Sequence, residues 1–222
     1  MSAAPAPAAT PGGPAPEEST LRDDGAPRRR PQRTEASRQK IFEASMRLIG
    51  ERGASEVTVD EIAAEAGVSK GTVYYNFGSK SELIAQLLRH GVDIMLARFA
   101  ALPPEEDPVL AMEAVVTEAI AFLDGYPSFG QLWMNENWKA ENEWRDLMQE
   151  LRTELLDVIA RALDRISRHY AVNQEVSRSG LEAAIFGACF IVGLDRKNFH
   201  PERSQSASVE AIMTFVKGYL AR

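Results

Sequence analysis

The stretch TVDEIAAEAGVSKGTVYYNFGSKSEL at residues 58–83 predicts two short helices separated by a glycine turn, and then the start of a third helix. Thr58 and Glu61 have the spacing of a capping box, in which a hydroxyl and a carboxylate bond the backbone donors that a new helix leaves unpaired. Gly67 permits the tight reversal, and Gly78 ends the second short helix. Two short helices joined by such a turn form the helix-turn-helix that binds DNA.

The second short helix offers side chains that suit both base edges and phosphates. Lys70 can donate to guanine O6 or N7, and the Thr72 hydroxyl can bond either a base or a phosphate. Gly71 removes a side chain where the backbone would lie close to DNA. Tyr74 and Tyr75 carry hydroxyls suited to phosphate oxygens, although Tyr74 could instead pack in the core. Adjacent helical residues point about 100° apart, so both rings cannot face inward.

This stretch resembles the DNA-binding signature of the TetR family of bacterial transcriptional regulators. The usual string is T-x-x-x-I-A-x-x-A-G-V-S-x-G-x-x-Y-x-x-F-x-S-K-x-x-L, and it is matched here by Thr58, Ile62, Ala63, Ala66, Gly67, Val68, Ser69, Gly71, Tyr74, Phe77, Ser79, Lys80 and Leu83. The resemblance covers about residues 36–85. It implies DNA contacts at Thr58, Lys70, Gly71, Thr72, Tyr74, Tyr75 and Lys80, and Ser69, the expected helix cap, completes the predicted set.

Composition excludes several other classes of protein. A hydrophobic fraction of 45% and a charged fraction of 26% are those of a soluble globular protein. No apolar run approaches the roughly 18 residues of a membrane span, and the N-terminus lacks a secretory apolar segment. The single cysteine, Cys189, excludes an internal disulfide, and no metal-binding, nucleophile–base or phosphate-loop motif is apparent. We therefore expect a cytoplasmic protein that is not an enzyme and needs no metal or cofactor.

The net charge of −7 is distributed unevenly along the chain. Residues 1–27 carry −3, residues 28–100 carry +3 from twelve basic and nine acidic residues, and residues 101–222 carry −7. The positive segment is the one that contains the helix-turn-helix, whereas phosphate would repel the acidic remainder. The excess is small, but its place along the chain favours DNA binding.

The chain divides into three predicted segments. Residues 1–34 hold seven of the twelve prolines and are expected to be a disordered arm. The arm ends in a basic cluster that could enter the minor groove or remain in solvent, and this cluster consists of Arg28, Arg29, Arg30 and Arg33. Residues 35–85 form the predicted DNA-binding domain. Residues 86–222 form a larger helical domain for ligand binding and dimerisation.

Periodicity predicts an all-α chain of about nine helices and no strand. Beyond the two short helices, the expected ranges are 35–52, 79–101, 108–124, 127–139, 141–170, 174–194 and 205–220. The helix at 79–101 belongs to both domains, so it is the candidate lever between them.

Large apolar side chains gather in the middle of the chain, where the resemblance implies a small-molecule pocket. The candidate ligand contacts are Phe99, Phe122, Phe129, Trp133, Met134, Trp138 and Trp144. The same residue types also fill cores, so each of them could be structural instead. Polar groups that could orient a ligand, or could simply be solvated, are Asn135, Glu136, Asn137 and His169. Cys189 could sense oxidants or pack as a small apolar residue.

The last two predicted helices combine small and apolar residues at spacings that allow close helix packing. The candidate dimer contacts are Ala184, Gly187, Ala188, Val192, Ile212, Phe215, Val216 and Tyr219. They suit a two-fold interface between copies but could equally pack inside one chain. A single recognition helix reads few base pairs, which favours a homodimer on a pseudo-palindromic operator.

The sequence thus predicts a homodimeric DNA-binding repressor that a small hydrophobic or aromatic ligand releases from double-stranded DNA. The alternative is a DNA-binding protein of the same fold that has no small-molecule inducer and is controlled by a protein partner. Such a chain would fill its cavity with its own aromatic side chains.

Overall fold

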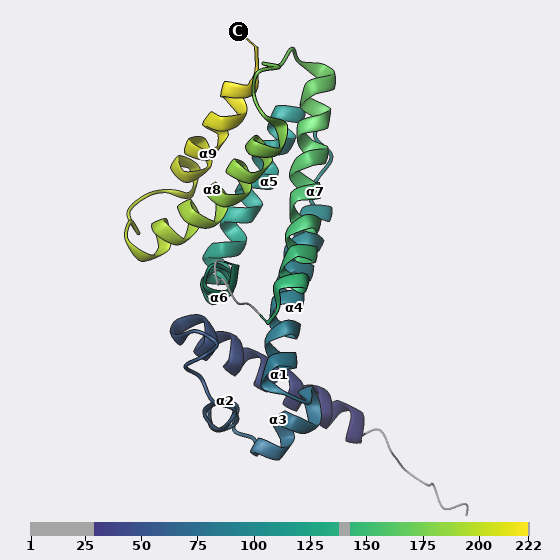
Figure 1. The fold of residues 1–222 in the computed structure, drawn as a ribbon, viewed down its shortest axis with the longest axis vertical. Coiled ribbons are helices and arrows are strands. Elements are labelled where there is room, and N and C mark those ends of the chain that lie inside the picture. The colour runs from purple at the N-terminus through teal and green to yellow at the C-terminus, as the bar shows by residue number, and fades with distance from the viewer. Residues whose placement is uncertain (1–28, 138–142, 222) are drawn as a thin grey trace, which may run out of the picture.

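A computed structural model describes residues 29–137 and 143–221, and this part of the chain is mostly helical (Figure 1). Its helices are α1 (Arg29–Arg52), α2 (Val59–Ala66), α3 (Lys70–Phe77), α4 (Lys80–Ala100), α5 (Pro108–Gly125), α6 (Pro127–Asn137), α7 (Arg145–His169), α8 (Arg178–Asn198) and α9 (Gln205–Tyr219). An isolated antiparallel bridge joins Val172 to Leu220. The predicted all-α class is confirmed.

Three predicted helix starts differ from those observed. α1 begins at Arg29, six residues before the expected start, so part of the predicted arm is helical backbone. α8 begins at Arg178, four residues later than expected, because the Ser177 hydroxyl caps it by accepting from the Gly180 N–H at 3.3 Å. α7 begins at Arg145 rather than at 141. Two residues singled out from the sequence, Arg28 and Trp138, lie outside the described residues.

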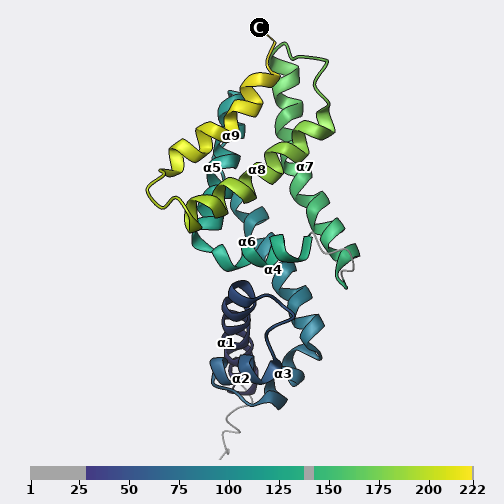
Figure 2. The ribbon, with the colours of Figure 1, turned by 60° about the vertical axis from the view of Figure 1, so that its left-hand side comes forward.

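The chain forms a small head and a larger body that share one helix. The head consists of α1, α2, α3 and the first half of α4, and the body consists of the rest of α4 with α5–α9 (Figure 1). α4 runs without interruption from one to the other. α6 lies across the base of the body, directly against α1 (Figure 2).

Local capping chemistry fixes the two short helices of the head. The Glu61 N–H donates to Thr58 Oγ1 at 3.2 Å, and the Thr58 N–H donates to Glu61 Oε2 at 2.8 Å, which confirms the predicted capping box. Gly67 closes α2 in the left-handed region at φ 65°, where a β-carbon would be strained. Ser69 then caps α3 by accepting from the Thr72 N–H at 3.1 Å.

One apolar core holds the head together. Buried side chains from all four of its helices meet there, and they include Ile41, Ile49, Ile62, Val73, Phe77, Leu83 and Leu87. Arg38 adds a polar clamp over this core, because its guanidinium lies 4.9 Å from the centre of the Phe77 ring and donates to the Asn76 carbonyl at 3.3 Å. The α2–α3 unit is therefore held rigidly on α1 and α4.

Two close contacts hold α6 against α1 of the head and against the middle of α4. A β-carbon at Gly50 of α1 would lie 2.3 Å from Ser128 Cβ, and one at Gly91 of α4 would lie 2.2 Å from the ring of Phe129. Distances this short show that α6 packs against the helix backbones themselves. Both glycines are buried, and a larger residue at either would push the helices apart.

Polar contacts join α4 to α7 on another side. The Arg89 guanidinium donates to Glu150 and to Glu154, each at 2.7 Å. Nearer the head, Trp144 Nε1 donates to the Ser81 carbonyl at 3.2 Å and to its hydroxyl at 3.1 Å. The first half of α4 is therefore attached at two points to α7 and to the residue that precedes it.

The contact between α6 and α4 predicts the effect of one substitution. Gly91→Ala should lower stability by about 1–3 kcal/mol, because the new methyl group would overlap the fully buried ring of Phe129. Replacing the ring by a smaller side chain, in Gly91→Ala/Phe129→Leu, should lower the free energy of unfolding by less than the sum of the two single changes. Urea unfolding of the purified variants measures these values.

Gly125→Ala is the matched control, because nothing lies within 4 Å of a β-carbon at Gly125. We expect its unfolding free energy to stay within about 0.5 kcal/mol of the original. An unfolding midpoint of Gly91→Ala equal to that of the unmodified chain would contradict the account of this contact.

Candidate functional site

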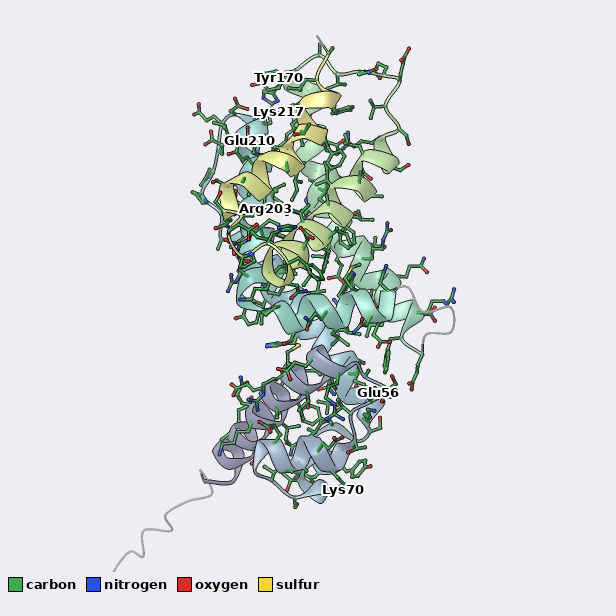
Figure 3. The ribbon with its side chains drawn as sticks, turned by 90° about the vertical axis from the view of Figure 1, so that its left-hand side faces the viewer. Glu56, Lys70, Tyr170, Arg203, Glu210 and Lys217 are labelled. Atoms are coloured by element: carbon green, nitrogen blue, oxygen red, sulfur yellow. The ribbon has the colours of Figure 1, made fainter. Side chains whose placement is uncertain are left out.

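Most of the predicted DNA-binding residues belong to α3 or cap it. Tyr75 is 81% exposed and Tyr74 is 44% exposed, so both rings of α3 are available to a partner. Their neighbours Val73 and Phe77 are buried instead. The end of the head that carries Lys70 points away from the body (Figure 3). α3 thus offers its polar face outward and its apolar face to the core.

Lys70 and Asp60 form an ion pair between α3 and α2. Lys70 Nζ lies 2.8 Å from Asp60 Oδ2, and both side chains are largely exposed. The hydrogen bond and the charge of Asp60 raise the pKa of Lys70 above its ordinary value. Lys70 is therefore charged, and its ammonium group is held at the end where the two helices begin.

The Thr58 hydroxyl is engaged in the capping box and in a short chain of polar contacts. Thr58 Oγ1 lies 2.8 Å from Glu61 Oε2, and Arg52 Nη1 donates to the other carboxylate oxygen of Glu61 at 2.8 Å. These bonds lower the pKa of Glu61 to about 2, and the bond from the Thr58 backbone N–H has the largest effect. The N-terminus of α2 is thereby attached to the end of α1.

The remaining predicted DNA contacts differ in their hydrogen bonds and in their exposure. Ser69 Oγ and Thr72 Oγ1 lie 2.8 Å apart, so these two hydroxyls bond each other at the start of α3. Lys80 is partly exposed in the first turn of α4. Gly71 is exposed, and a β-carbon there would meet only Ser69 Oγ, at an ordinary 3.8 Å. The fold itself therefore has room for a side chain at Gly71.

An apolar cavity lies inside the body between α4, α5, α7 and α8. Its volume is about 30 Å³, which is room for one or two water-sized groups. It is lined by Met95, Phe99, Val115, Val116, Ala119, Leu123, Leu155, Val158, Ile159, Ile185, Phe186, Cys189 and Phe190. α4 thus contributes to the wall of the cavity at one end and to the head at the other.

The predicted ligand residues fall in several places. Phe99 lines the cavity. Phe122, Phe129 and Trp133 are almost fully buried and pack on one another, with neighbouring ring centres 5.4 and 6.0 Å apart. These three rings fill the core, which is the structural alternative that the sequence left open. Met134 is partly buried against the same core.

Trp144 lies at the start of α7, where its indole bonds Ser81, and it does not line the cavity. Glu136 is fully buried in α6, so its interpretation as a surface residue was wrong. Asn135 and His169 are exposed, and Asn137 is partly exposed. His169 Nδ1 lies 2.8 Å from the Arg165 carbonyl. None of these four polar residues lines the apolar cavity.

Cys189 lines the cavity and is buried. Burial raises the pKa of its thiol to about 12. Because the thiolate is the reactive form, this thiol is poorly suited to sensing oxidants. Its surroundings are those of a small apolar residue.

The predicted dimer residues divide into two groups. Ile212, Val216 and Tyr219 are buried inside the chain, which is the alternative that the sequence left open for them. Phe215 is 45% exposed, and the other four, which are Ala184, Gly187, Ala188 and Val192, are partly exposed on α8. Ile191, which was not predicted, is 55% exposed beside them. α8 and α9 therefore keep an apolar outer face.

Sequence reasoning missed Asp60 and most residues that line the cavity. Asp60 is one acid among several in the head, and its pairing with Lys70 depends on the turn between α2 and α3. The cavity residues are ordinary apolar positions of α5, α7 and α8, which no motif distinguishes. No cluster of potential metal ligands occurs among the described residues. Within the same residues, no helix has the length and apolar character needed to cross a membrane.

Comparison with protein families identifies the head. Residues 41–87 match the model of "Bacterial regulatory proteins, tetR family". A similar protein is the HTH-type transcriptional regulator BetI of Brucella abortus, which is 39% identical over 90 residues, or 38% of this chain and 45% of BetI. The regulator TtgR of Pseudomonas putida is 33% identical over 93 residues, or 41% of this chain and 44% of TtgR. The match thus spans less than half the length of these relatives.

Solved structures resemble most of the fold. A Clostridium perfringens protein described as a fatty acid metabolism regulator is 26% identical, with a TM-score of 0.67 over 82% of this chain and 100% of that one. AibR, solved in complex with isovaleryl coenzyme A and operator DNA, is 18% identical, with a TM-score of 0.67 over 83% of this chain and 100% of AibR. A Saccharomonospora viridis regulator solved with choline is 21% identical, with a TM-score of 0.68 over 85% and 100%.

The carboxylate of Glu61 predicts a pH dependence of stability. The pKa of Glu61 is about 2 in the folded chain, against an ordinary value of 4.5. Its contribution to the free energy of unfolding is therefore fully present above pH 4.5 and is lost as the pH falls towards 2. Glu61→Gln cannot ionise, so the urea midpoint of this variant should fall less steeply over that range. Parallel midpoint curves for the two proteins would contradict the assignment.

Proposed function

This chain is a member of the tetR family of bacterial regulatory proteins, and we propose that it acts as a homodimeric transcriptional repressor in the cytoplasm. The observation that carries this proposal is the exposed side of α3, a short helix with a capped start whose Tyr74 and Tyr75 are open to a partner and whose Lys70 lies beside the capped start of α2. Helix N-termini attract phosphate, and the side chains at the start of α3 suit base edges. The relatives compared above are regulators, so we propose no enzymatic activity.

In the proposed complex, α3 enters the major groove. Lys70 and Thr72 face base edges, whereas Tyr74, Tyr75 and Lys80 bond phosphates. Thr58 and Ser69 support the two helix starts through their capping bonds. Gly71 lets the backbone of α3 approach the DNA, since the fold itself leaves room for a side chain there.

Dimerisation follows from the small size of one head. A single short recognition helix contacts too few base pairs for a specific operator, so two-fold pairing and a pseudo-palindromic site are expected. The exposed apolar face of α8 and α9, with Ile191 and Phe215, is the surface that we assign to the partner copy.

Ligand control is proposed from the position of the cavity. A small hydrophobic ligand larger than the present volume of about 30 Å³ would have to spread the helices around it. Met95 and Phe99 place α4 among those helices, and α4 continues into the head. Ligand entry would therefore move the heads and weaken operator binding.

A second mode of regulation is favoured by the small size of the same cavity. Phe122, Phe129 and Trp133 fill the core, so the chain could also act without a small-molecule inducer, under the control of a protein partner. The DNA-binding role is common to both modes, and a ligand screen separates them.

The proposed DNA contact is tested by selection from a random 30-base-pair duplex library followed by sequencing. We expect an enriched site made of two inverted half-sites. Gly71→Ala should bind this site at least about tenfold more weakly, because its methyl group would stand between the α3 backbone and the DNA. Its unfolding midpoint should be unchanged or slightly higher, since the fold has room for the methyl group and alanine favours helical backbone.

Gly125→Ala again serves as the control, because it makes the same change in the body. Its affinity for the selected site should equal that of the unmodified chain. Enrichment of no sequence by the unmodified chain would contradict the DNA-binding role. Full affinity of Gly71→Ala would contradict the proposed position of α3.

Ligand control is tested by thermal unfolding against hydrophobic cations, aromatic acids, acyl compounds and antibiotics. A true ligand at 100 times its Kd should add about 2.7 kcal/mol per site, which is a rise of several degrees in Tm. Val116→Ile adds one methyl group to the wall of the cavity, and it should reduce the rise without weakening DNA binding. A panel without any saturable rise would favour control by a protein partner.

A further inference from the structure

The starts of α2 and α3 bring a basic and an acidic side chain together at the edge assigned to DNA. Asp60 is the second residue of α2 and Lys70 is the first residue of α3. Lys70 Nζ lies 2.8 Å from Asp60 Oδ2, with the side chains 50% and 68% exposed. Lys70 lies at the end of the head remote from the body (Figure 3).

The bond between the two side chains contributes little to folding, although Asp60 in the first turn of α2 suits the positive end of that helix. Ion pairs between exposed side chains contribute little to stability, because water screens them and both side chains lose freedom. Neither residue belongs to the apolar core of the head. The pair also leaves the base-reading end of α3 without net charge at this point. A carboxylate next to the phosphate backbone repels it, so Asp60 lowers the affinity for non-specific DNA.

A base pair offers this arrangement something that a phosphate does not. Guanine presents O6 and N7 as acceptors for the Lys70 ammonium, and the paired cytosine presents its N4 amino group as a donor to a carboxylate. Phosphate has acceptors alone. A guanine–cytosine pair can therefore engage both members of the ion pair, whereas the backbone engages one and repels the other.

We propose that Asp60 is a specificity-determining residue that holds Lys70 for a guanine–cytosine pair and opposes its binding to phosphate. The inference rests on the proposed DNA-binding function and adds the base pair that one part of the head prefers. Asp60 acts in two ways, by directing the ammonium group of Lys70 and by excluding contacts that lack a cytosine amino group.

The test compares the unmodified chain with Asp60→Asn, Asp60→Glu and Lys70→Gln in selection from the same random duplex library. Asp60→Asn should lose about fivefold or more in its preference for guanine at one position of each half-site, with the other positions unchanged. Lys70→Gln should lose the same preference, and Asp60→Asn should have no further effect in that background. Asp60→Glu keeps a carboxylate and should retain the preference.

A second measurement uses poly(dA·dT) duplex, which contains no guanine. Asp60→Asn should bind it more tightly than the unmodified chain, and the slope of log affinity against log salt should steepen by about one. The control is Glu51→Gln, which removes one negative charge from the exposed face of α1. Its salt slope and base preference should match those of the unmodified chain.

The outcomes separate this inference from the function on which it rests. An enriched site whose guanine preference is the same in Asp60→Asn, with an unchanged salt slope, overturns the role of Asp60 alone. An equal effect of Glu51→Gln also overturns it, because the cause would then be net charge rather than the pairing with Lys70. Enrichment of no sequence by the unmodified chain overturns both proposals.

Discussion

The close packing of α6 against two glycines is the constraint on which the arrangement of this chain depends. Gly50 of α1 and Gly91 of α4 let Ser128 and Phe129 approach to distances at which a β-carbon could not stand. Because these contacts reach the helix backbones, the head cannot tilt on the body without separating them. The ion pairs of Arg89 with α7 hold α4 from another side. The orientation of the head is therefore set by the body, and a change in the body can reach the head through α4 and α6.

The head could be predicted closely from its sequence because neighbouring residues determine it. The Thr58–Glu61 capping box, the positive φ of Gly67 and the Ser69 cap each depend on residues at most three positions apart. Chemistry of this range can be inferred from a single chain. In the body, the periodicity predicted the helices, but helix starts such as those of α1 and α7 differed by several residues. The sequence could not tell which apolar residues border a cavity, because Phe122 in the core and Phe186 at the cavity are chemically the same.

Contacts between residues distant in the sequence were the part that the sequence did not reveal. The indole of Trp144 bonds Ser81 across 63 positions, although its residue type suggested a ligand contact. Glu136 is buried although its charge suggested the surface. Lys70 meets Asp60 across the turn between α2 and α3, ten positions away. In each case the partner is decided by how helices pack, and packing is a property of the whole chain rather than of a local pattern.

Under the proposed function, the small cavity links ligand affinity to the control of DNA binding. The existing cavity of about 30 Å³ must be enlarged before a larger ligand fits, and part of the ligand's binding free energy is used to move the helices. The apparent affinity is therefore the intrinsic affinity multiplied by the fraction of molecules in the open state. The same movement is what reaches α4 and the head. Strong control of DNA binding therefore accompanies reduced ligand affinity. Operator DNA favours the closed state, so it should weaken ligand binding by the same factor by which the ligand weakens DNA binding. A preformed cavity of sufficient size would bind its ligand more tightly, but ligand binding would then not require α4 to move.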